Sequence, residues 1–275
     1  MSHDVENYFS FGRNWAKFIS SIDRDRIRAA ERHLCNALHV DHLKGIEFLD
    51  VGSGSGLFSL AARSLGARVY SFDIDPLSVA CTSRLKEHYF PADRDWIIEQ
   101  GTILDKAYVD KLGKFDIVYS WGVLHHTGDM HKAFDHVDHL VKQNGRLFIS
   151  IYNDQGLPSR IWKQVKATYN RSYKPVKGLL ILIVFIYYEF KRFLGALSRV
   201  ENPFRFRRWR EHKLDRGMSK WYDTIDWVGG YPFEVAKPEQ VFQTFHDKGY
   251  VLQHLKTCRG DIGACEYVFR KAYEG

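Results

Sequence analysis

FLDVGSGSG, residues 48–56, is the stretch that decides how this chain folds. It joins the end of an apolar, strand-like run to a turn in which every second residue is glycine, and the helical run LFSLAARSL follows at once. Glycine is needed where the backbone turns sharply and approaches a ligand closely. The stretch therefore predicts a strand, a turn that borders a ligand, and a helix.

Strands and helices alternate on both sides of this turn. Asp23 is placed to cap a helix that ends near Leu38. The further runs are strands at 46–51, 67–73, 96–100, 115–120, 146–152 (after an Asn144-Gly145 turn), 251–258 and 265–271, and helices at 57–65, 76–89, 108–112, 131–141 and 238–249. This order predicts an α/β fold, a doubly wound and mostly parallel seven-stranded sheet with an antiparallel last strand.

The region 153–236 interrupts the alternation and is rich in aromatic and basic residues. We interpret it as a helical lid inserted between strands five and six, which divides the chain into residues 1–152, 153–236 and 237–275. Its apolar run GLLILIVFIYYEF, residues 178–190, is shorter than the ~18 to 20 residues of a spanning helix. Basic flanks favour a helix in a membrane interface, whereas the length of the run also suits a buried lid helix or a homodimer seam.

A second feature identifies the ligand as a nucleoside. Asp73 ends the next strand, where an acidic side chain can accept hydrogen bonds from the two hydroxyls of a ribose. The dinucleotide fingerprint G-x-G-x-x-G would place its third glycine at position 57, but that residue is leucine and the third glycine is Gly56. The pattern is instead D-x-G-x-G-x-G.

That pattern resembles motif I of class I S-adenosylmethionine methyltransferases, and the resemblance covers about 46–152 and 238–270. It implies S-adenosylmethionine as the cofactor, with its methionine part beside the glycine turn and its ribose on Asp73. Most relatives carry Gly-Asp after the third strand; Thr102 stands in place of that acid, so a hydroxyl and backbone groups are expected to contact the adenine. The resemblance and the strand ends together imply these cofactor-binding residues: Asp50, Gly52, Ser53, Gly54, Gly56, Asp73, Ile74, Gly101, Thr102, Ile103, Ser120 and Trp121.

The stretch FDIVYSWGVLHHTGD, residues 115–129, carries the second strong resemblance, to the F-D-hydrophobic-V motif followed by V-L-H-H. The ends of parallel strands line the ligand crevice, so His125 and His126 are expected beside the cofactor or the acceptor. One interpretation is that these histidines pack or cap a helix. The other is that one of them, His126 before His125, accepts a proton from the methyl acceptor.

The acceptor is less well defined. Asp226, Tyr231 and Glu234 lie in a loop dense in aromatics and glycines and are candidate acceptor contacts, although buried rings anchoring a turn would give the same pattern. We expect methyl transfer to an oxygen of a small-molecule, glycan or lipid-linked acceptor. An RNA methyltransferase is favoured by the net charge of +7, but Ser-Trp-Gly-Val stands where many adenine-amino methyltransferases carry Asn-Pro-Pro-Tyr. A non-catalytic domain that binds the cofactor is the third alternative.

Composition bounds the remaining expectations. Cys35, Cys81, Cys258 and Cys265 are spread along the chain without a C-x-x-C pair, which favours buried thiols in a reducing compartment. The first twenty residues lack a secretory pattern, so we expect a cytoplasmic protein, in contact with the membrane surface if the lid binds lipid. No metal is expected, because no cluster with ligand spacing accompanies the helical histidines.

Overall fold

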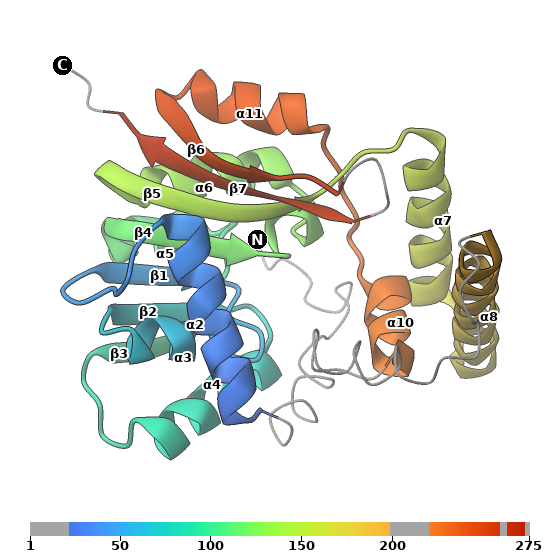
Figure 1. Ribbon diagram of the computed structural model, residues 1–275, viewed down its shortest axis with the longest axis horizontal. Helices are drawn as coiled ribbons and strands as arrows, with labels where there is room; N and C mark the ends of the chain where they lie inside the picture. The colour runs from blue at the N-terminus through green and yellow to red at the C-terminus, as the bar shows by residue number, and fades with distance from the viewer. Residues whose placement is uncertain (1–21, 199–219, 259–262, 273–275) are drawn as a thin grey trace. The chain divides into compact units, whose positions relative to one another are not determined.

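The computed structural model describes residues 22–198, 220–258 and 263–272 (Figure 1). The described residues divide into two compact units. The first unit contains the sheet and consists of the described residues up to Ser159 and those from Pro232 onward. The second unit, called the inserted unit below, is Arg160–Tyr231.

The first unit is built on one sheet with the strand order β3-β2-β1-β4-β5-β7-β6. The five strands β1 to β5 pair in parallel with their neighbours, and β7 runs antiparallel to both β5 and β6. This confirms the predicted fold. The strands are β1 (Glu47–Val51), β2 (Arg68–Asp73), β3 (Trp96–Gln100), β4 (Phe115–Trp121), β5 (Val141–Tyr152), β6 (Tyr250–Lys256) and β7 (Ala264–Lys271).

Helices cover both faces of the sheet (Figure 1). One face carries α2 (Arg24–Leu38), α3 (Leu57–Ser64) and α4 (Pro76–Tyr89), and the other carries α5 (Lys106–Leu112), α6 (Met130–His139) and α11 (Pro238–His246). Aspartate caps start four of these helices, because each carboxylate accepts a hydrogen bond from a backbone N–H of the first turn. These caps are Asp23, Asp75, Asp105 and Asp129.

Alternation along the strands explains why two hydrophobic layers form. In β1, Phe48 packs into the layer under α2 and α3, whereas Leu49 and Val51 pack into the layer under α6 and α11. In β4, Tyr119 and Val118 divide between the same two layers. Side chains two residues apart share a face of a strand, so a strand with apolar residues on both faces contributes to both hydrophobic layers.

One local expectation needs correction. The Asn144-Gly145 pair does not separate α6 from a strand at 146: β5 already begins at Val141 and passes through it, with Asn144 at a φ of +61° and a shift in pairing with β4. The pair therefore forms an irregularity inside the strand, which the same left-handed backbone permits. The segment after β6 and the start of β7 bring the sulfurs of the free thiols Cys258 and Cys265 to 3.8 Å.

The inserted unit has its own small core. Its helices are α7 (Leu157–Arg171, which starts just before the unit), α8 (Lys174–Ser198) and α10 (Lys220–Gly229). Tyr169, Ile181, Val184 and Val228 are buried together at their contact. In the part of the chain that the structure describes, no helix combines the length and apolar character needed to cross a membrane.

Candidate active site

The glycine turn after β1 is fixed against the end of β2. The backbone N–H groups of Gly52 and Ser53 both donate to the Phe72 carbonyl, at 2.9 and 3.1 Å. Gly52 has a φ of +76°, and a Cβ placed there would lie 2.5 Å from the Val123 side chain. Gly56, at a φ of +80°, begins α3 as its N-cap. Only glycine fits Gly52 without displacing the loop after β4.

Asp73 lies at the centre of this edge of the sheet. Its Oδ2 accepts a hydrogen bond from the Gly54 N–H at 2.9 Å, and its Oδ1 accepts one from the Asp75 N–H at 2.8 Å. Burial nevertheless raises the pKa of the carboxyl to about 6. The adjacent Ile74 carbonyl accepts from the Gln100 side chain at 3.2 Å. A carboxylate has about four acceptor positions, so these backbone donors do not fill all of them.

Asp50 faces the interior of the protein. Its carboxylate accepts a hydrogen bond from the Ser59 hydroxyl, which lies 2.8 Å from the Ser71 hydroxyl. The Trp96 indole N–H donates to Ser71 at 2.9 Å, which extends the buried network to β3. Burial raises the pKa of Asp50 to about 7. The network joins β1, α3, β2 and β3 beneath the turn, and a direct contact of Asp50 with a cofactor stays a prediction.

The loop after β3 packs tightly on α5. A Cβ at Gly101 would lie 2.3 Å from the ring of Tyr108, so this position also requires glycine. The Thr102 hydroxyl accepts from the Leu104 N–H at 3.2 Å, within its own turn, and Ile103 is buried. Thr102 thus stands at the strand end as predicted, with its oxygen used in part by the loop.

The end of β4 places a buried hydroxyl and an exposed ring next to the glycine turn. The Ser120 hydroxyl donates to the Val51 carbonyl at 3.2 Å, and Ser120 is fully buried. Trp121 is 41% exposed and stacks on Phe58, with ring centroids 6.4 Å apart. Phe58 belongs to the first turn of α3. Trp121 therefore offers an apolar surface at the same edge as the turn.

The two histidines follow in a short 3-10 helix, η2 (Leu124–His126). His126 Nδ1 lies 2.6 Å from the Pro232 carbonyl oxygen. A carbonyl can only accept, so Nδ1 carries the proton and Nε2 of the neutral ring is the proton acceptor. His125 is fully buried and packs on Tyr152, with ring centroids 4.0 Å apart. The geometry suits His126 for base chemistry and His125 for packing.

The segment that follows the inserted unit completes the surroundings of the histidines. Glu234 donates its backbone N–H to the His125 carbonyl at 2.9 Å, and its Oε1 accepts from the Met130 N–H at 3.3 Å, at the start of α6. Asp226 and Tyr231 belong to the inserted unit. Their role as acceptor contacts stays a prediction.

Sequence reasoning missed four residues that shape this edge: Phe58, Val123, Tyr152 and Pro232. Phe58 and Val123 are near the recognised motifs, but a side chain that only packs has no pattern of its own. Pro232 lies 106 residues from His126, and it contributes a backbone carbonyl. No spacing in the sequence predicts that contact.

A parallel sheet with this strand order and an antiparallel β7, together with a glycine turn facing a buried acid at the ends of β1 and β2, defines the class I S-adenosylmethionine-dependent methyltransferases. In the described residues, no group of three or more His, Cys, Asp or Glu side chains is placed to hold a metal ion. Residues 22–180 match the model of the methyltransferase domain family, and the chain belongs to that family.

Curated relatives share part of this region. A ubiquinone biosynthesis O-methyltransferase from Glaesserella parasuis is 30% identical over 130 residues, which are 44% of this chain and 54% of that protein. A protein of the same name from Bartonella quintana is 25% identical over 171 residues, 58% of this chain and 65% of its own. The chain spans about half the length of most of the curated relatives it matches.

Solved structures share the fold at low sequence identity. Magnesium protoporphyrin IX methyltransferase from Synechocystis, solved with bound SAH, is 15% identical with a TM-score of 0.56 and 96% coverage of both chains. An S-adenosylmethionine-dependent methyltransferase from Listeria monocytogenes is 13% identical with a TM-score of 0.53, covering 90% of this chain and all of its own. These likenesses establish a common architecture.

Proposed function

We propose that this protein transfers a methyl group from S-adenosylmethionine to an oxygen of a small-molecule acceptor, with His126 as the general base. The observation that carries the proposal is the 2.6 Å contact between His126 Nδ1 and the Pro232 carbonyl. This contact fixes the tautomer in which Nε2 is the unprotonated ring nitrogen. When bound, S-adenosylmethionine supplies a sulfonium methyl group that an acceptor oxygen can attack in line.

The residues present fit this cofactor. Asp73 is a buried carboxylate whose pKa is raised to about 6, so additional donors would stabilise its charged form. Two ribose hydroxyls are such donors, and charge-assisted hydrogen bonds are the strong ones. The turn from Gly52 to Gly56 would border the methionine part, and Gly101 with Thr102 the adenine. Trp121 would cover the site with its exposed ring.

His126 would act on the acceptor. A hydroxyl loses its proton as its oxygen forms the new bond to carbon, and a positioned base that takes this proton commonly contributes ~10²- to 10⁴-fold in rate. Pro232 would orient the ring through its carbonyl oxygen, which accepts the Nδ1 proton in a hydrogen bond. Tyr152 and His125 would restrict the ring from the other side, since both rings pack against it.

The names of the relatives support oxygen on a small molecule as the acceptor: those quoted above are O-methyltransferases of ubiquinone biosynthesis. A hydroxyl acceptor agrees with the proposed base, because a proton must leave as the bond forms. A glycan or a lipid-linked hydroxyl meets the same chemical requirement.

The test has two parts. Purified protein with methyl-labelled S-adenosylmethionine is incubated with fractionated lipid, glycan, small-molecule and RNA pools. Label in a hydroxyl-containing small-molecule or lipid fraction is expected, and label confined to RNA would overturn the proposed acceptor class. With the labelled acceptor in hand, His126→Asn is compared with wild type, because the amide can still donate to Pro232 but cannot accept the proton.

We expect His126→Asn to lower kcat by roughly 10²- to 10⁴-fold and to leave the Kd for S-adenosylmethionine unchanged. The acid limb of the pH profile of kcat should disappear with it. His139→Asn is the matched control, since that side chain is 55% exposed at the end of α6. A kcat equal to wild type in His126→Asn would remove the base from the mechanism.

A further inference from the structure

Helix α8 of the inserted unit has two opposite apolar faces. Its inner face is buried with Tyr169 and Val228 through Ile181 and Val184. Its outer face is formed by large apolar side chains at the spacing i, i+3, i+4, i+7, i+8, i+11, which places them on one side of a helix. The outer face consists of Leu179, Leu182, Ile183, Ile186, Tyr187 and Phe190, each between 45% and 60% exposed.

The six exposed side chains of the outer face are neighbours on one side of the helix, so they form a contiguous apolar surface. Soluble proteins commonly expose single hydrophobic residues, whereas a contiguous apolar stripe marks an interaction site. The six residues of the outer face span three turns with no charge among them, and Glu189 lies at its border. Lys174 precedes the outer face on the same helix, and Lys191 follows it directly. An apolar stripe with cations at both ends is typical of a helix that lies in the surface of a bilayer.

The charge of the inserted unit indicates which surface it would meet. Residues 160–231 hold 16 of the 40 Lys and Arg but only 6 of the 33 Asp and Glu, a net charge of +10. The remainder of the chain, with 24 basic and 27 acidic residues, is therefore at −3. The excess positive charge of the protein lies entirely in the segment that carries the apolar stripe. Anionic lipids complement both properties at once.

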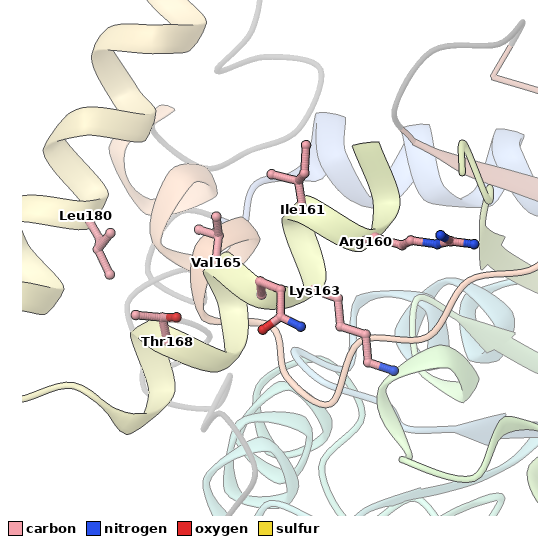
Figure 2. Close-up of a pocket in the computed structure, with 7 residues that line it drawn as sticks. Arg160, Ile161, Lys163, Val165, Thr168 and Leu180 are labelled. Atoms are coloured by element: carbon pink, nitrogen blue, oxygen red, sulfur yellow. The ribbon is translucent and has the colours of Figure 1, made fainter. Parts of the chain in front are cut away.

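A groove on the inserted unit is also lined by both apolar and cationic side chains. It has a volume of about 530 Å³ and lies along α7, with Leu180 of α8 as one of its walls. Ile161 and Val165 contribute apolar surface, and Arg160 and Lys163 contribute charge. Figure 2 shows both cationic side chains reaching away from Leu180. An acyl chain next to a phosphate has this distribution of apolar surface and negative charge.

A second copy of the chain fits less well. In a symmetric dimer the same patch faces itself, so the outer face of α8 would be covered by another α8. The same symmetry would bring one unit of +10 against another. Like charges at short range oppose association, and salt would then promote dimerisation. The positive charge of the inserted unit attracts an anionic bilayer, whereas it repels a second copy of the same unit.

We infer that the outer face of α8, together with described cations of the inserted unit, docks onto an anionic lipid bilayer surface. The protein binds peripherally: the apolar side chains enter the interface, and Arg160, Lys163, Lys174 and Lys191 contact lipid phosphates. This property is independent of the proposed methyl transfer, because vesicle binding is measured without an acceptor and without turnover.

The test is flotation of the full chain with vesicles. Vesicles of phosphatidylcholine and phosphatidylserine are compared with pure phosphatidylcholine, at low salt and at about 0.5 M salt, where the Debye length falls to roughly 4 Å. We expect the protein to float with the anionic vesicles, at least tenfold more weakly in high salt. Double replacement Ile183→Ser and Ile186→Ser should abolish flotation, and Arg160→Gln with Lys163→Gln should weaken it severalfold.

The matched control is the pair Ile97→Ser and Val251→Ser, which removes two equally exposed apolar side chains on β3 and β6. This control should float as wild type does. Melting curves and light scattering accompany every variant. Wild-type protein that stays at the bottom of the low-salt gradient would overturn the inference. So would a dimer that the α8 variant dissociates while neither protein floats, because the stripe would then belong to a second copy.

Discussion

Gly52 is the position at which a single methyl group most directly tests the site geometry. A Cβ there would lie 2.5 and 2.6 Å from the two methyl groups of Val123, and the backbone is at a φ of +76°. The left-handed backbone costs a non-glycine residue ~1 to 2 kcal/mol. The overlap adds about 1 to 3 kcal/mol, typical of an overpacked core. Gly52→Ala should therefore lower the free energy of unfolding by roughly 2 to 5 kcal/mol.

Gly45→Ala separates the two contributions. Gly45 has nearly the same φ, +79°, but nothing lies within 4 Å of its Cβ position. Urea unfolding should show only the smaller, backbone cost for this variant. Val123→Ala in the Gly52→Ala background should recover most of the overlap cost, and the double-mutant cycle measures that coupling. Equal costs for the two glycine variants, or no coupling, would refute the packing described for this turn.

Three further outcomes follow from buried charges. The affinity for S-adenosylmethionine should fall as the pH drops through about 6, because protonation removes the charged acceptor at Asp73, and calorimetry on Asp73→Asn should show no such fall. Asp50 has a pKa raised from 3.8 to about 7, so its stabilisation is complete below pH 3.8 and is lost as the pH rises through 7; Asp50→Asn should flatten this decline in urea unfolding. Lys166, buried against Trp227, has a pKa lowered from 10.5 to about 7, so stability should rise between those pH values, and Lys166→Met should remove the rise.

The order of elements could be predicted because its signals are local. A buried strand, a glycine turn and an aspartate cap each occupy a few adjacent residues, as in the run from Phe48 to Gly56 and at Asp75. The role of the Asn144-Gly145 pair was harder to predict, because a left-handed backbone at Asn144 occurs both in hairpin turns and in irregularities within a strand. Only the pairing of Val141 with Phe115 decides between them.

The candidate site likewise contains residues that a local motif predicts and residues whose contacts depend on the completed fold. Positions such as Gly52 and Asp73 follow from a compact motif, and both lie at the predicted edge of the sheet. The inward orientation of Asp50 depends on Ser59 and Ser71, whose hydroxyls have no distinctive spacing. Contacts that join distant segments through backbone atoms are set by the completed fold and leave no pattern in the chain.

The two ends of the excursion between β5 and α11 meet each other. Asn153 forms a bridge with Ala236, whose N–H donates to the Tyr152 carbonyl at 3.0 Å and whose carbonyl accepts from Asp154 at 3.1 Å. A segment that leaves and returns at one point can be exchanged between proteins with little strain on its host. Pro232 lies just inside that junction. Because the Pro232 carbonyl contacts His126 Nδ1, a different segment grafted here would also change the orientation of the His126 ring.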